Sequence, residues 1–255
     1  MITKEQLHEI GRIKKLNRGQ AEKDYLLDLI LHSTTTNTKD ELVFKGGTCL
    51  NKVYNMNRFS EDLDFTQTKK LDLKRLTETI IRDLKYFNIE ATVEQKKVYD
   101  SVTTRFRVKG PLYTGDDKST TTLRMDVNLK STVILPPETI HLSSLYPEVP
   151  STHVLVMNKK EILAEKIRAL STRSKPRDLY DIYYLLGKNV AIDKQLVEEK
   201  LGYYNEKLDV RKIEAAIEEV RNSWSREMKT LTRDPPEYHE VARLVSRKLK
   251  EDLSK

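Results

Sequence analysis

The sequence predicts an α/β (α+β) fold, in which a domain of strands and helices over residues 1–157 precedes a helical domain over residues 158–255. Two observations predict this organisation. Short runs that alternate apolar and polar side chains, such as "VTTRFRVKG" at residues 102–110, have the period of half-buried strands and lie before Pro150. From Asn158 onward the apolar residues recur at helical spacing almost without interruption. This change of period places the domain boundary near residue 157.

The first domain is expected to combine helices with strands. Its strand-like segments end at glycines or turn-rich sequences, and its helical segments carry their apolar residues on one side. The expected helices cover residues 20–31, 48–54 and 71–86, and the expected strands cover residues 41–47, 62–66, 89–95, 102–110 and 121–129. Thr48 is the expected N-cap of the short second helix, because its side chain can accept from a free backbone N–H. "GPLYTGDDKS" predicts a hairpin connection between the last two strands.

The second domain is expected to contain helices only. The apolar spacing predicts helices over residues 159–170, 177–186, 193–201, 210–229 and 236–253. Pro176 is well placed at the start of the second of these helices, since a proline at the first helical position loses no hydrogen bond. The helices after about residue 190 carry no motif that indicates a function.

The composition bounds the class of protein. The 255 residues carry a formal net charge of +7, with 38% hydrophobic and 33% charged residues. This balance predicts a globular chain and modestly favours a polyanionic partner, although a charge-rich surface accounts for it equally well. No run approaches the roughly 18 apolar residues that span a bilayer, and residues 1–19 lack the apolar core of a secretory signal. The single cysteine, Cys49, excludes an intramolecular disulfide. We therefore expect a cytoplasmic protein without a membrane partner.

The segment "FKGGTCLNKVYNMNRFSEDLDFT", residues 44–66, holds the first candidate site. Asp62 and Asp64 are two positions apart in an expected strand, so both side chains project from one face. Carboxylates this close repel each other unless a cation lies between them, and divalent cations prefer such oxygen ligands. Gly46 and Gly47 lie between an expected strand and an expected helix, where backbone N–H groups favour phosphate. Solvated aspartates and an ordinary tight turn are the simpler interpretation of the same residues.

A third carboxylate lies on another expected strand, "TTLRMDVNL". The apolar face of that strand consists of Leu123, Met125, Val127 and Leu129, which leaves Asp126 on the opposite face with Arg124 and Asn128. If the strand neighbours residues 62–66, three carboxylates converge, and such a set can hold the two Mg²⁺ ions of a phosphoryl displacement. Otherwise Asp126 is an ordinary residue of a half-exposed strand. Arg58 and Ser60 extend the polar row backward if the chain is already extended there.

Two charged residues stand out in the helical domain. Lys166 lies beside the apolar stripe of the first helix, and Asp178 lies in the first turn of the second. A simple interpretation covers both, because a lysine stem can lie along a core edge with its ammonium in water, and an aspartate stabilises a helix N-terminus. Alternatively, residues 159–188, with eight Lys/Arg against four Asp/Glu, form a surface that faces phosphate.

These motifs in this order resemble one family. The segments "GGTCLNK" at residues 46–52, "RFSEDLD" at 58–64, "KIRA" at 166–169 and "RDLYD" at 177–181 look like those of the AbiEii/AbiGii (MenT-like) nucleotidyltransferases. Members of that family are known as toxins of type IV-like toxin–antitoxin systems. The resemblance covers about residues 20 to 190. It implies a polymerase-β-like core with a mixed sheet, followed by a helical domain that contributes Lys166 and Asp178.

The resemblance also implies a reaction and a set of partners. The enzyme would transfer a nucleoside monophosphate from an NTP to an acceptor, often the 3′ end of tRNA, with Mg²⁺ or Mn²⁺, and a neighbouring gene would encode a cognate antitoxin. Asp62, Asp64 and Asp126 would hold the metal, and Lys166 and Asp178 would complete the catalytic set. Nucleotide binding would fall to Gly46, Gly47, Thr48, Arg58, Ser60 and Lys166.

Two other functions compete with this interpretation. A D-x-D glycosyltransferase that uses a nucleotide sugar explains Asp62 and Asp64 but not Asp126, the glycine turn or Lys166. A non-catalytic RNA-binding protein explains the net charge of +7 but not the carboxylates, since an acidic cluster repels phosphate unless metal intervenes. The five histidines show no metal-ligand spacing, and no serine- or cysteine-based nucleophilic arrangement is evident.

Overall fold

The computed structural model describes residues 1–253, and the chain forms two compact units. The first, which we call the sheet unit, comprises Met1–Asn55, Phe59–Thr132 and Pro137–Val156. The second, the helical unit, comprises Met56–Arg58, Val133–Pro136 and the chain from Met157 onward. The chain enters the helical unit for the last time at Met157. The two short excursions at residues 56–58 and 133–136 have no signal in the sequence.

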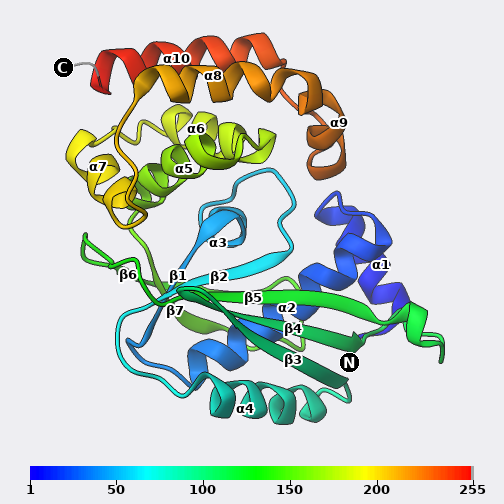
Figure 1. Ribbon diagram of the computed structural model, residues 1–255. Helices are drawn as coiled ribbons and strands as arrows, with labels where there is room; N and C mark the ends of the chain where they lie inside the picture. Colours follow the sequence, from blue (N-terminus) through cyan, green and yellow to red (C-terminus); the bar gives the residue numbers. More distant parts are fainter. Residues whose placement is uncertain (254–255) are drawn as a thin grey trace. The chain divides into compact units, whose positions relative to one another are not determined.

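The sheet unit is built on one mixed sheet, shown with its strands labelled in Figure 1. The strand order is β3-β4-β5-β2-β1-β7-β6. β2 pairs with β5 and β1 with β7 in parallel, and the other neighbours are antiparallel. The strands are β1 (Leu42–Lys45), β2 (Asp62–Gln67), β3 (Glu90–Val98), β4 (Ser101–Lys109), β5 (Thr121–Asn128), β6 (Glu138–Leu142) and β7 (Thr152–Val156). The helices are α1 (Lys4–Ile13), α2 (Arg18–Thr36), α3 (Gly46–Lys52) and α4 (Leu73–Tyr86), with a 3₁₀ turn at Asp117–Ser119.

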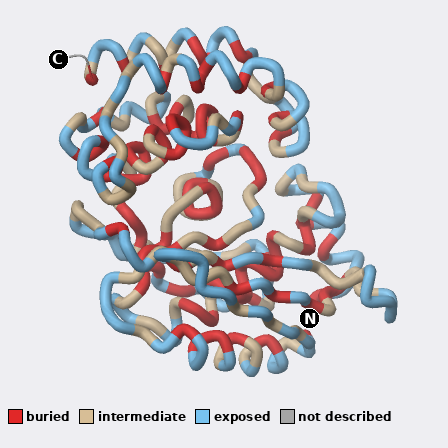
Figure 2. Tube along the Cα trace, viewed as in Figure 1, coloured by how far each residue is buried: buried red, intermediate tan, exposed pale blue. Residues whose placement is uncertain are grey.

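One face of this sheet is covered and the other is open over β3, β4 and β5. α4 packs on β3, and α2 packs on β7, β5 and β2. Phe106 and Val108 of β4 are fully buried, whereas Arg105 and Arg107 between them are exposed, and Figure 2 shows this alternation as changing colour along the strands. Gln95 of β3 donates to Leu73 O of α4, so the odd-numbered residues of β3 face the helices. The even-numbered residues of β3 and the odd-numbered residues of β4 therefore face away from them.

The helical unit packs its helices around α5. The helices are α5 (Lys159–Arg173), α6 (Pro176–Gly187), α7 (Lys194–Gly202), α8 (Val210–Glu219), α9 (Arg221–Leu231) and α10 (Tyr238–Leu253). α5 contacts α6, α7 and α8, and α10 covers α6 and α8. The expected mixed sheet followed by helices is thus confirmed. No helix within residues 1–253 is long and apolar enough to cross a membrane.

A buried ion pair ties the helical unit together. Lys200 on α7 has a side chain that is 1% exposed, and its Nζ lies 2.5 Å from Glu161 Oε1 on α5. The same carboxylate accepts backbone N–H groups of Ile134 and Leu135, each at 2.9 Å. Glu161 is fully buried, so one side chain neutralises a buried ammonium and satisfies the amides of the 133–136 excursion.

Several local expectations are wrong. α3 begins at Gly46 with Lys45 as its N-cap, so Thr48 lies inside the helix, because the glycines join the helix instead of ending the strand. The single helix expected over residues 210–229 is two helices, and Val220 ends α8 and begins α9. The break turns α9 so that Trp224 and Met228 are buried. Leu129 follows the end of β5 and is 37% exposed, so it is not part of the apolar face.

Glu161→Ala should lower the free energy of unfolding of the helical unit by about 3–5 kcal/mol, because it leaves Lys200 and two amides buried without their main acceptor. Urea denaturation followed by circular dichroism measures this change. Glu198→Ala, at an exposed position on α7, is the matched control and should be nearly neutral. Equal midpoints for the two variants would contradict the anchoring role of Glu161.

Candidate active site

The pairing of β2 with β5 brings the sequence-predicted carboxylates together. The two strands are parallel, and Asp64 lies opposite Asp126 while Asp62 lies opposite Arg124. Asp62, Asp64 and Asp126 are all half-buried; Asp64 and Asp126 lie between buried apolar neighbours on their own strands, and Asp62 precedes the buried Leu63. The condition for their convergence, that the strand of Asp126 neighbours that of Asp62 and Asp64, is therefore met. A shift of one residue in this register would turn one set of carboxylates toward the helices.

Arg124 supplies positive charge among these carboxylates. Its Nη2 lies 2.8 Å from Asp62 Oδ2, and its Nε lies 2.9 Å from Asp126 Oδ2. Thr103 on β4 donates to Asp126 Oδ1 at 2.5 Å. Burial on its own would lower the pKa of the Arg124 guanidinium, but Asp62, Asp126 and Asp64 outweigh it and raise the pKa, so Arg124 stays charged. Sequence reasoning placed Arg124 on the correct face but gave it no role.

The three carboxylates have the chemistry of a divalent-metal site. Carboxylate oxygens that share one face of neighbouring strands are the ligands that Mg²⁺ takes. Within residues 1–253, however, no group of three or more His, Cys, Asp or Glu side chains is arranged to hold a metal ion. Arg124 bridges Asp62 and Asp126 in this arrangement. The donor set thus fits Mg²⁺ in its chemistry, and a metal would take over the charge balance that Arg124 now provides.

The glycine turn is shaped around Asp64. Gly46 has φ of 79°, a conformation that L side chains rarely adopt, and a Cβ built on it would lie 2.9 Å from Asp64 Cγ. Thr48 is fully buried and its hydroxyl donates to the backbone carbonyl of Asp62. Gly47 lies between them in the first turn of α3 and is buried. The α3 N-terminus is therefore fixed directly against the beginning of β2. Ser60, in the irregular segment before β2, is half-buried.

The helical unit holds a second charged cluster around Lys166. Lys166 Nζ lies 2.7 Å from Asp181 Oδ2 and 3.3 Å from Asp178 Oδ1. Arg58 binds Asp181 with two hydrogen bonds, from Nε at 2.6 Å and from Nη2 at 2.7 Å. Arg173 binds Asp178 in the same two-pronged way, with both distances 2.7 Å. Two buried carboxylates are thus surrounded by three cations.

The contacts in this cluster bear on the simple interpretation of Lys166, in which its ammonium lies in water. The Lys166 side chain is only 10% exposed and its ammonium contacts carboxylates, so it does not reach for water. Burial on its own would raise the pKa of the Asp178 carboxyl, but Lys166 and Arg173 outweigh burial and hold the pKa at about 2. Arg58 is buried against Asp181 and lies outside β2, which begins at Asp62. Asp181 was visible in the sequence as the i+3 neighbour of Asp178 on a helix, yet no role was assigned to it.

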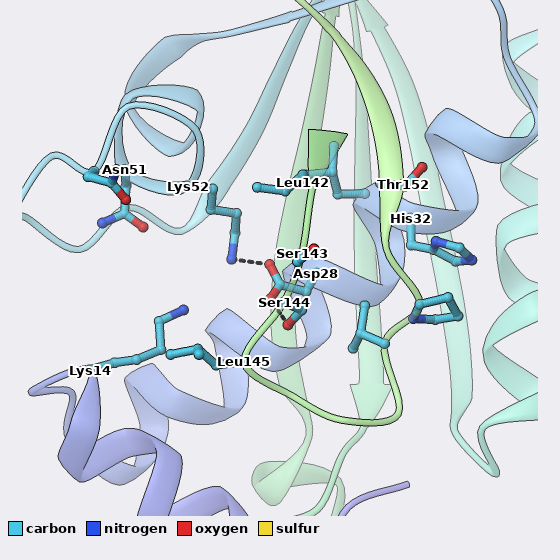
Figure 3. A pocket seen from close by; sticks show the side chains of 14 residues that line it. Lys14, Asp28, His32, Asn51, Lys52, Leu142, Ser143, Ser144, Leu145 and Thr152 are labelled. Carbon is cyan, nitrogen blue, oxygen red and sulfur yellow. Dashed lines mark hydrogen bonds and ion pairs between the residues drawn. The ribbon is translucent and has the colours of Figure 1, made fainter. Parts of the chain in front are cut away.

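The sheet unit also contains a pocket of about 200 Å³ that includes none of these carboxylates. Figure 3 shows it between α2, the last residues of α3 and the segment that joins β6 to β7. Lys52 lines it and is bound to Asp24 at 2.8 Å and to Asp28. Lys14 also binds Asp24. The charges of this pocket balance one another, and they hold the end of α3 to α2.

Comparisons with known proteins identify a family and a fold for this chain. A family model described as "Nucleotidyl transferase AbiEii toxin, Type IV TA system" matches residues 30–248. The solved structure of MenT4, a nucleotidyltransferase toxin from Mycobacterium tuberculosis, superposes with a TM-score of 0.69 at 20% identity, over 97% of this chain and 88% of that one. JHP933 from Helicobacter pylori superposes with a TM-score of 0.60 at 18% identity, over 94% of each chain. No curated protein sequence matches significantly.

Gly46→Ala should destabilise the sheet unit by about 1–3 kcal/mol, because the new Cβ is strained at positive φ and displaces Asp64. Thermal melting measures the loss. Gly187→Ala serves as the control, since a Cβ there meets no atom within 4 Å. A Gly46→Ala variant that melts with the wild type would show that the turn tolerates a side chain beside Asp64.

The low pKa of Asp178 predicts an acid-dependent loss of stability. Its folded value of about 2 lies below the ordinary value of about 3.9, so between these values the unfolded chain binds more protons than the folded one. The stabilisation is therefore complete above about pH 5 and is lost as the pH falls toward 2. Between pH 7 and pH 3, the loss of unfolding free energy in urea denaturation should be about 1 kcal/mol smaller for Asp178→Asn than for the wild type. Parallel pH profiles for the two proteins would contradict the assignment.

Proposed function

Because the chain belongs to the AbiEii family of nucleotidyltransferase toxins of type IV toxin–antitoxin systems, we propose that it transfers a nucleoside monophosphate from an NTP to the 3′ hydroxyl of an RNA. The proposed acceptor is the 3′ end of tRNA, and the proposed cofactor is a pair of Mg²⁺ ions, or Mn²⁺ in their place. The single observation that carries the proposal is the register of β2 and β5, which aligns Asp64 with Asp126 and places Asp62 on the same face.

In the proposed reaction, the oxygen of the RNA 3′ hydroxyl forms a bond with the α-phosphorus of the NTP. The bond from that phosphorus to the oxygen that bridges to the β-phosphate breaks, and pyrophosphate leaves. Asp62, Asp64 and Asp126 would hold the metal, and Asp126 would favour departure of the hydroxyl proton. Bound Mg²⁺ would stabilise negative charge on the attacking and leaving oxygens.

The other residues would bind and orient the triphosphate. Backbone N–H groups of Gly46, Gly47 and Thr48 would serve its phosphates, and the Thr48 hydroxyl already fixes α3 to the carbonyl of Asp62. Ser60 would add a hydroxyl donor. We assign Lys166 to neutralising phosphate charge, since its ammonium is held at a defined position by Asp178 and Asp181. Arg58 would then act through Asp181, to which it is bound.

The toxin role implies a partner and a place of action. A cognate antitoxin from a neighbouring gene would restrain the enzyme, which would act in the cytoplasm where NTP and tRNA occur together. The D-x-D glycosyltransferase and the non-catalytic RNA-binding protein receive no support from the family match, which is to nucleotidyltransferases. Synthesis of the chain without its antitoxin should slow growth.

Asp62→Asn and Asp64→Asn should each abolish transfer while the protein stays folded, because the change removes repulsion between carboxylates as well as a metal ligand. Purified protein is incubated with each α-³²P-labelled NTP in turn, Mg²⁺ and total cellular RNA, and the products are separated on a denaturing gel. Asp234→Asn, in an exposed turn, is the matched control and should transfer at the wild-type rate. Near-wild-type labelling of RNA by Asp62→Asn or Asp64→Asn would overturn the site assignment, and label on protein would overturn the RNA acceptor.

A further inference from the structure

A row of arginines crosses the open face of the sheet, which we define by Arg105 and Arg107 on β4 and Arg124 on β5. Arg105 and Arg107 are exposed, and both point away from the helices that cover the opposite face. Two residues farther along β4, Lys109 continues the row. Basic side chains thus follow one another along one face of β4, beginning beside the carboxylates.

The protein itself pairs this positive charge only weakly. Arg105 lies opposite Arg124 on β5 and opposite Glu94 on β3. Arg124 is already bound to Asp62 and Asp126. Glu94 offers Arg105 only a loose ion pair, at 3.6 Å between exposed side chains. Arg107 lies opposite Thr92 and Thr122, and no ion pair to it within 4.0 Å is present among residues 1–253. Exposed positive charge that the protein pairs only weakly suits an anionic partner.

The row is continuous with the candidate active site. Arg124 binds both Asp62 and Asp126, and Thr103 of β4 lies opposite Asp126. Given about 4.8 Å between strands and about 3.4 Å per residue, the backbone of Arg105 lies about 8 Å from that of Asp126. Arg107 lies one further pair of residues away. These spacings correspond to the first few nucleotides behind a 3′ end bound at the carboxylates.

A cavity adjoins the far end of the row. It has a volume of about 740 Å³ and its lining includes Thr92, Arg107, Lys109 and Lys85. Glu90 and Asp117 also contribute to it, and Glu90 is bound to Lys109 at 2.6 Å. The cavity offers room and hydroxyl donors beside Arg107. These features suit a ribose-phosphate backbone as a partner better than they suit the flat surface of another protein.

We propose that this open face binds the phosphate backbone of the acceptor RNA directly behind its 3′ end, with Arg105 and Arg107 as the phosphate contacts. The proposal rests on the proposed nucleotidyl transfer and adds the surface that holds the acceptor. Guanidinium groups suit phosphate because their N–H donors match two of its oxygens. Contacts of this kind carry no base information, so the face positions a single-stranded end without reading its sequence.

Direct binding tests the surface apart from catalysis. The probe is a short single-stranded RNA with a free 3′ hydroxyl and a 5′ fluorescein, and its anisotropy is followed with increasing protein at several salt concentrations. R105Q/R107Q should weaken binding at least about tenfold and should lower the slope of log K against log salt by about 1.4. Arg75→Gln, at an exposed site on α4 behind the covered face, should leave both unchanged.

Two further measurements separate this proposal from its alternatives. The melting temperature of R105Q/R107Q should stay close to that of the wild type, since both side chains are exposed and the only ion pair lost among residues 1–253 is the loose one between Arg105 and Glu94. In the transfer assay, its KM for RNA should rise at least about tenfold while its KM for NTP stays the same. Absence of transfer by the wild type would instead count against the proposed function itself.

Two outcomes overturn the proposal. One is wild-type RNA affinity in R105Q/R107Q while the wild type transfers nucleotide to RNA. The other is unchanged RNA affinity in R105Q/R107Q together with a loss of neutralisation, so that co-expression of the antitoxin from the neighbouring gene no longer protects cells from the variant. That result would assign the face to the antitoxin.

Discussion

The electrostatic repulsion among Asp62, Asp64 and Asp126 is the constraint on which the candidate site depends. The parallel pairing of β2 with β5 forces the three carboxylates onto one half-buried surface, where they repel each other more strongly than in water. Arg124 compensates by binding Asp62 and Asp126 at once. The same guanidinium is therefore both the internal counter-charge of the site and the first member of the basic row on the open face.

The helical unit also brings carboxylates close together, but it buries them fully and balances them with three cations. Asp178 and Asp181 are fully buried, which is tolerable only because Arg173, Arg58 and Lys166 each contact one or both of them. Every member restrains the position of its neighbours, so Lys166 is held without relying on solvent. A fixed ammonium needs no reorganisation when charge develops on a phosphate, and this is the form of stabilisation that phosphoryl transfer requires of a protein.

The sequence predicted the features that repeat locally and missed those that depend on distant partners. Alternation was sufficient to place Asp62 and Asp64 on one face of β2 and Asp126 on the polar face of β5, because side-chain direction in a strand has a period of two. That the three share one surface depends on the pairing of β2 with β5, which the sequence left as a condition. The polar face of β5 also contained Arg124, but its role depends on the register with β2, which no local pattern fixes. α1 was missed although Thr3 and Gln6 form a capping box, and β6 was missed because it is a short, largely exposed edge strand. The partnership of Arg58 with Asp181 joins residues 123 positions apart, beyond any pattern in the chain.

A crystal structure with Mn²⁺ and a non-hydrolysable NTP analogue tests the central claim most directly, since anomalous scattering locates the metal without reference to activity. The account predicts Mn²⁺ bonded to Asp62 and Asp64, the triphosphate at Gly46 and Gly47, and Arg124 released from Asp62. Nucleotide bound elsewhere, or bound here with Arg124 still bridging the carboxylates and no metal between them, would contradict it.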